Sequence, residues 1–217
     1  MPLARRSRIR ERKAVVGRAA ALRTLVLVAA GDPRPEGDPP FSPQERELLA
    51  RPPAEWDEQE VTDALWRGEA LGTLGWALQL VADLPAYDAP FDQAAVAREL
   101  AFEGAALRGA DEIEQARETA RLWHWRARTT LLQREATVEL PERWTSFDQL
   151  IAAAAMRGYE EGKLPAPLRG DFRAFGKIYR HLDERQQALA HSIAAERHYA
   201  LEWLCGEASW DDVETDT

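Results

Sequence analysis

The chain has 217 residues, of which 45% are hydrophobic and 30% charged, a balance typical of a folded globular protein. Its net charge of −9 disfavours a general nucleic-acid binder, because such proteins are usually basic or carry a concentrated basic face. Arg18 and Arg23 interrupt the amino-terminal apolar run, and no run approaches transmembrane length, so we expect no membrane partner. The single cysteine, Cys205, fits a reducing, cytoplasmic location.

The two ends of the chain carry opposite charge. Residues 1–13 hold six basic side chains against Glu11 alone, whereas the segment after Gly206 holds five carboxylates and no base. The simpler interpretation is two solvated ends that attract each other. The alternative is that the basic arm, residues 5–13, contacts RNA, lipid or an acidic partner. We expect no nucleic-acid binding elsewhere.

Apolar periodicity and turn residues predict about seven helices. They cover residues 11–30, 43–51, 58–83, 92–103, 111–136, 146–161 and 183–206. An irregular or small β segment is expected near 165–180, which prolines and glycines punctuate. The predicted fold class is therefore all-α, as a single compact multi-helix domain.

No sharp domain boundary is visible. Residues 1–31 form a basic arm and first helix, 32–57 a Pro-rich connection with a short helix, and 58–217 the main helical domain. One domain overall is the favoured organisation. Capping boxes are predicted at three helix starts, namely Ser42 with Glu45, Asp111 with Glu114, and Asp183 with Gln186.

Three glycines share one stripe of the predicted helix over residues 58–83. Gly68, Gly72 and Gly75 follow the i, i+4, i+7 spacing. Each glycine costs about 1 kcal/mol relative to alanine inside a helix, so a stripe of three needs a reason. We expect another backbone to pack closely there; the alternative is a kinked helix.

Charged side chains also interrupt the apolar lines of three predicted helices. The four residues concerned are Glu69, Arg126, Glu196 and Arg197. A buried charge is costly unless it is paired, and arginine can hold a carboxylate through two hydrogen bonds. We therefore predict a buried or half-buried network of these four residues. It either fixes helix register or provides an acid or base beside an arginine that holds an anionic substrate.

A second cluster lies on another face of the last helix. His198, Glu202 and Cys205 are of residue types that bind zinc, but no Cys-x-x-Cys pair or matching second helix accompanies them. We regard them as weak metal candidates and expect no metal and no cofactor. Arg117, Arg121, His124 and Arg128 form a basic stripe that is either a solvated face or a contact for an acidic partner or for the chain's own acidic tail.

Several established catalytic patterns are absent from the sequence. It contains no P-loop, no Gly-rich dinucleotide turn, no Gly-x-Ser-x-Gly elbow and no His-Glu-x-x-His motif. This lowers the odds of an enzyme without excluding one.

Separate motifs along the chain point to one family. They are Glu69-Ala70-Leu71-Gly72, Leu84-Pro85-Ala86-Tyr87-Asp88, Leu122-Trp123-His124-Trp125-Arg126, Glu196-Arg197-His198-Tyr199, and Trp210-Asp211-Asp212-Val213. In this order they resemble the bacterial family of uncharacterised proteins known as domain of unknown function 4272, over roughly residues 60–217. The amino-terminal part is less similar. The resemblance implies one compact domain, no established activity, and a place for Glu69, Arg126, Glu196 and Arg197 inside the shared motifs.

Two functions follow from these patterns. The leading hypothesis is a protein-interaction or regulatory module that presents an acidic surface to an unknown protein partner. The alternative is a small-molecule-binding protein or enzyme built around the network of Glu69, Arg126, Glu196 and Arg197. The oligomeric state is not indicated.

Overall fold

Side-chain caps set where several helices begin. The computed structural model describes residues 8–134, 140 and 143–215. At the start of α2 (Pro43–Leu49), Ser42 and Glu45 exchange the two hydrogen bonds of a capping box. Asp183 and Gln186 do the same before α7 (Glu184–Cys205). These two predicted boxes are confirmed, and each satisfies amide groups that a helix start otherwise leaves without partners.

The described residues form seven α-helices and one small sheet, which confirms the all-α fold class. The other helices are α1 (Arg12–Ala29), α3 (Glu58–Ala77), α4 (Gln93–Glu99), α5 (Ala110–Leu132) and α6 (Phe147–Glu160). The predicted small β segment is also present. Strands β1 (Arg173–Ala174) and β2 (Lys177–Ile178) pair antiparallel, with Arg173 opposite Ile178.

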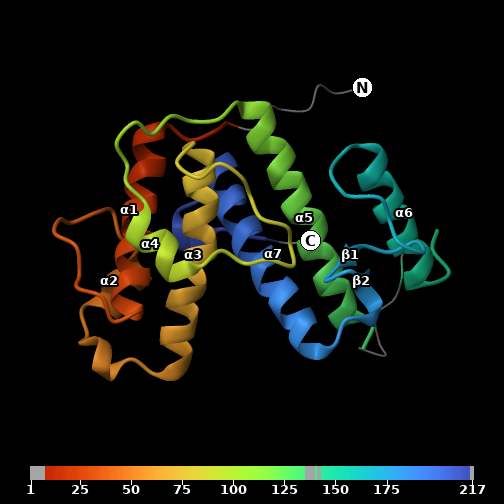
Figure 1. Cartoon of the computed structure of the whole chain (residues 1–217), viewed down its shortest axis with the longest axis horizontal. Helices are drawn as coiled ribbons and strands as arrows, with labels where there is room; N and C mark the ends of the chain where they lie inside the picture. The colour runs from red at the N-terminus through yellow and green to blue at the C-terminus, as the bar shows by residue number, and fades with distance from the viewer. Residues whose placement is uncertain (1–7, 135–139, 141–142, 216–217) are drawn as a thin grey trace.

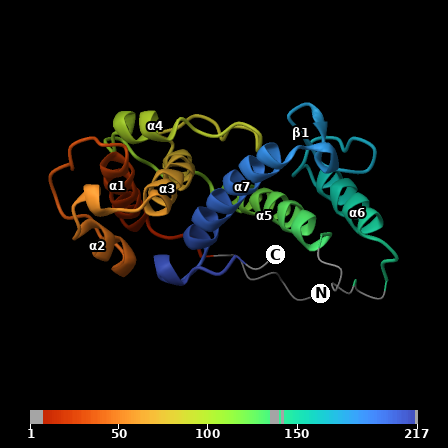
Figure 2. The ribbon, with the colours of Figure 1, turned by 90° about the horizontal axis from the view of Figure 1, so that it is seen from below.

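The longer helices pack side by side in a row (Figures 1 and 2). Helix α1 packs on α3, α3 on α7, α7 on α5, and α5 on α6, while α4 covers α1 and α3. A continuous apolar core runs through this row, and Leu22, Leu71, Ile113 and Leu201 are fully buried in it. Burial of this apolar surface is the main force that holds the helices together.

Three helix boundaries differ from the sequence-based predictions. Helix α3 ends at Ala77 because Gln79 adopts a left-handed φ of 59° and the amides of Leu80 and Val81 both bond to the Gly75 carbonyl. Helix α4 ends at Glu99, where the backbone becomes extended. Helix α5 ends at Leu132, and residues 135–136 of the predicted helix lie outside the described residues.

The predicted capping box of Asp111 and Glu114 is wrong. Helix α5 begins at Ala110 with Gly109 as its N-cap and no side-chain cap. Asp111 therefore lies within the first turn rather than before it. There its carboxylate and that of Glu112 face the positive end of the helix dipole, which is also stabilising.

The glycine stripe of α3 receives another part of the chain, as predicted. A Cβ on Gly68 would lie 2.9 Å from the Cα of Gln93, and one on Gly72 would lie 2.5 Å from the Phe91 ring. The start of α4 and the residue before its N-cap thus lie directly against α3. The backbone of Gln93 is therefore the one whose close packing the glycine stripe predicted.

The basic arm contacts the other end of the chain through one arginine. The Arg10 backbone amide donates to the Leu204 carbonyl at 3.0 Å, and its Nε donates to the Trp203 carbonyl at 2.6 Å. Arg10 therefore caps the carboxyl end of α7, where the helix dipole favours a cation. Residues 5–7 of the arm lie outside the described part. Within that part, no helix has both the length and the hydropathy to cross a membrane.

Candidate functional site

Two of the four predicted network residues form a fully buried ion pair. Glu69 comes from α3 and Arg197 from α7, and neither side chain is exposed. Both Nε and Nη2 of Arg197 reach Oε1 of Glu69, at 2.7 and 2.6 Å. Glu69 Oε2 accepts the backbone amide of Phe91 at 3.0 Å. Burial raises the pKa of Glu69, and the Arg197 charge opposes that rise.

The other two network residues have partners of their own. Arg126 on α5 binds Asp171 through two hydrogen bonds of 2.7 and 2.9 Å, and both side chains are fully buried. Burial works against the ionised form of Asp171, but the bonds and charge of Arg126 outweigh it and lower its pKa. Glu196 binds Arg67 of α3 at 3.1 Å. The four residues therefore lie in three ion pairs rather than one network.

The remaining donors of Arg197 hold the loop over residues 84–91. Nη1 donates to the Pro85 carbonyl, and Nη2 donates to the Ala89 carbonyl at 3.1 Å. The guanidinium also lies 4.9 Å from the centre of the Tyr87 ring. Every polar atom of the buried pair is thus used, and its bonds fix a non-helical segment against α3 and α7.

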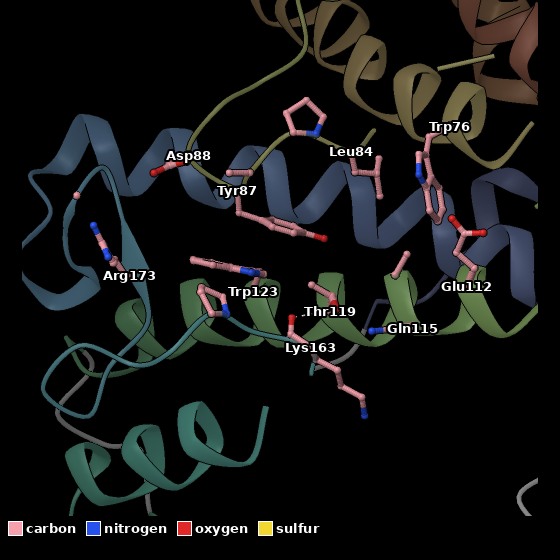
Figure 3. A pocket seen from close by; sticks show the side chains of 15 residues that line it. Trp76, Leu84, Tyr87, Asp88, Glu112, Gln115, Thr119, Trp123, Lys163 and Arg173 are labelled. Carbon is pink, nitrogen blue, oxygen red and sulfur yellow. Dashed lines mark hydrogen bonds between the residues drawn. The ribbon is translucent and has the colours of Figure 1, made fainter. Parts of the chain in front are cut away.

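Above α5, this loop forms one wall of a pocket of about 630 Å³ (Figure 3). Tyr87 of the loop stacks on Trp123 of α5, with ring centres 5.1 Å apart and planes 9° from parallel. Phe172 meets the Trp123 edge at 5.2 Å. Aromatic pairs of this kind add to the energy of burial and hold the Tyr87 ring against α5. Trp76 of α3 closes the other end.

Several polar side chains line this pocket, and most already have partners. The Asp88 carboxylate accepts the Phe175 amide, Glu112 binds Arg108 at 2.8 Å, and Thr119 donates to the Lys163 carbonyl at 3.2 Å. The Lys163 ammonium pairs with Glu118 and Glu161. Figure 3 shows the Tyr87 hydroxyl pointing along the pocket toward Trp76. The described lining contains no serine, cysteine or histidine.

Sequence patterns did not indicate this pocket. Its lining combines a loop, one side of α5 and the segment over residues 163–176, which no single periodic pattern connects. The motifs over residues 84–88 and 122–126 both contain lining residues, but they indicated the family and not a pocket. Asp171 was also missed, because it lies in the irregular region where helical periodicity gives no guidance.

The three weak metal candidates lie at the interface of α5 and α7. His198 Nε2 is 3.1 Å from Glu202, and His198 Nδ1 is 3.0 Å from Nδ1 of His124. Arg117 also binds Glu202, at 3.0 Å. Burial raises the pKa of Cys205 to about 12, so without a metal its thiol is protonated at neutral pH. No set of three or more His, Cys, Asp or Glu side chains in the described part converges on a metal position.

Hydrogen bonding assigns roles to the two histidines. A His198 Nε2–H that donates to Glu202 leaves the neutral ring with Nδ1 as an acceptor, so His124 donates its Nδ1–H. Burial, together with the charges of His198, His191 and Arg128, lowers the pKa of His124 to about 4.

Breaking the buried Glu69–Arg197 pair should be strongly destabilising. Arg197→Met leaves the Glu69 charge buried without a partner, and we expect a loss of about 3–5 kcal/mol in the free energy of unfolding. Arg67→Met removes one partner of a pair that is still partly exposed to water, and we expect about 1 kcal/mol or less. Urea denaturation measures both, and equal losses would contradict the assignment.

The histidine pair should make stability fall with acid. His124 has a lower pKa in the folded protein than its ordinary 6.5, so unfolding takes up a proton between pH 6.5 and about 4. The contribution of His124 to stability is therefore fully present above pH 6.5 and declines as the pH falls through that range. His124→Gln should flatten this decline in urea midpoints measured against pH. His181→Gln, at an exposed position, should not; a decline that His124→Gln leaves unchanged would refute the assignment.

Comparison with known proteins gives one match. The family model described as Domain of unknown function (DUF4272) matches residues 2–152, more than two thirds of the chain. The match includes the basic arm and α1, which the sequence resemblance left out, and it ends within α6. Neither the curated proteins nor the solved structures contain a match. The chain therefore belongs to the family named for this domain of unknown function, DUF4272.

Proposed function

We propose that this protein binds a small organic ligand in the pocket beneath the loop over residues 84–91. The observation that carries the proposal is that a fully buried ion pair, Glu69 with Arg197, is used to fix this loop. A buried ion pair adds little to stability compared with apolar packing, so its use favours a positioning role. The pocket volume, about 630 Å³, falls in the range typical of small-molecule sites.

In this proposal the ion pair holds the loop over residues 84–91, which forms one wall of the pocket, and the ligand contacts residues of the pocket lining. Glu69 and Arg197 have no exposure, so a ligand in the pocket does not touch them. The ligand instead packs on Trp76 and Trp123 and exchanges hydrogen bonds with Tyr87 and Gln115. Burial raises the pKa of Tyr87, which keeps its hydroxyl as a neutral donor.

Filling the pocket should abolish ligand binding. Ala116 lies in the floor and is only half-buried, so Ala116→Leu occupies the pocket without disturbing the core. A library of aromatic alcohols, amides and acids is screened by ligand-observed NMR against both proteins. We expect a set of ligands whose binding is lost in Ala116→Leu and kept in Ala154→Leu, which lies outside this pocket. No ligand with this behaviour would contradict the proposal.

A second candidate is the protein-interaction or regulatory module of the sequence-based hypothesis. A concavity of about 390 Å³ lies between α2, α3 and the segment that follows α7. Five of its lining residues are acidic and two are basic, so acidic side chains are in excess; the acidic ones are Glu45, Glu47, Glu60, Asp63 and Asp211. This acidic concavity favours a basic patch on a protein partner. The proposal keeps a cytoplasmic location, which rests on the single buried cysteine.

The interaction candidate is tested by charge reversal within the acidic concavity. The tagged protein is purified from its native host beside two double variants, Glu47→Lys with Asp63→Lys, and Glu99→Lys with Glu103→Lys. All four carboxylates lie at exposed positions, but only the first two line the concavity. We expect a stoichiometric protein partner that the first variant loses and the second retains. A partner retained by both would rule out this surface.

A further inference from the structure

A groove lies between α5 and α6, and Lys163 is the one described residue that lines both this groove and the loop pocket. The two helices approach closely at Gly158, where a Cβ would lie 3.2 Å from Leu122 Cδ1 and 2.5 Å from Leu164 Cδ1. Toward the start of α6, the short side chains of Ala153 and Ala154 leave a groove of about 750 Å³. The run of alanines in α6 thus creates space that longer side chains would fill.

Two tryptophans line this groove and give it an aromatic character. Trp125 lies on α5, and Trp144 lies just before α6. Among the described residues, Nε1 of Trp144 is buried and has no hydrogen-bond partner. A buried donor without a partner is costly, and a hydrogen-bond acceptor within reach of this atom would remove that cost. The indole therefore favours an occupant that carries acceptor oxygens.

The groove is cationic, although the whole chain carries a net charge of −9. Its described lining has four basic and two acidic side chains. Glu161 binds Arg157 and Lys163, and Glu118 also binds Lys163, so both carboxylates are taken. Arg121 and Arg143 leave two positive charges in excess, and Arg143 lies over the Trp144 ring with 5.3 Å to its centre.

We propose that the groove between α5 and α6 is a binding site for a small organic anion with a flat apolar ring. The ring lies on Ala153 and Ala154 and contacts the indoles of Trp125 and Trp144, which also line the groove. The carboxylate or phosphate of the ligand accepts hydrogen bonds from Arg121 and Arg143, whose planar groups suit such oxygens. This site is independent of the ligand proposed for the loop pocket.

The test compares two probes of nearly the same shape, one charged and one neutral. Naphthalene-1-acetate and naphthalene-1-acetamide are titrated into the full chain by isothermal calorimetry. We expect the acetate to bind at least about tenfold more tightly, and Arg121→Gln or Arg143→Gln to remove most of that difference, because a hydrogen bond to a charged group is worth about a factor of ten. Ala154→Leu should abolish binding of both probes.

Two control variants separate this groove from the rest of the molecule. Ala116→Leu fills the loop pocket, and Arg185→Gln removes an exposed arginine of α7, so neither should change the affinity for the acetate. Binding that Ala116→Leu abolishes, equal affinity for the two probes, or no saturable binding below about 1 mM would each overturn the proposal. If Ala154→Leu does not fold, the test rests on Arg121→Gln, whose exposed side chain can be replaced without disturbing the core. An unchanged preference for the acetate in that variant would then overturn the proposal.

Discussion

The carboxylate of Glu69 and the guanidinium of Arg197 meet inside the row of helices, where neither is exposed to water. Removing both groups from water is costly, and the cost is offset only because each polar atom of the pair finds a partner. Those further partners are the Phe91 amide and the carbonyls of Pro85 and Ala89. The polar atoms of the pair therefore all have partners when the loop over residues 84–91 adopts this conformation. The same loop conformation forms one wall of the pocket.

Helix α5 connects the different sites because consecutive residues of a helix point to different sides. Trp123 stacks on Tyr87 in the pocket wall, and His124 pairs with His198 on α7. Trp125 lines the groove between α5 and α6. Arg126, the next residue, anchors Asp171 and with it the segment that carries the small sheet. The motif over residues 122–126 thus contributes side chains to both proposed ligand sites, the loop pocket and the groove between α5 and α6.

Local signals predicted the local features of this fold. Ser42 and Asp183 cap their helices as their spacing with Glu45 and Gln186 indicates, and buried charges on apolar lines identified Glu69 and Arg197. The partners of Arg126 and Glu196 could not be predicted in the same way. They depend on contacts between segments far apart in sequence, which helical periodicity does not encode. The pocket was missed for that reason too.

The central claim is that the buried ion pair holds the loop in place, and hydrogen exchange tests it most directly. Glu69→Gln keeps the size of the side chain but removes the charge that binds Arg197 and the Phe91 amide. The account predicts faster amide exchange over residues 84–91, and at Phe91 above all, while α1 keeps its protection. Unchanged exchange in the loop, or an equal rise throughout the helices, would contradict it.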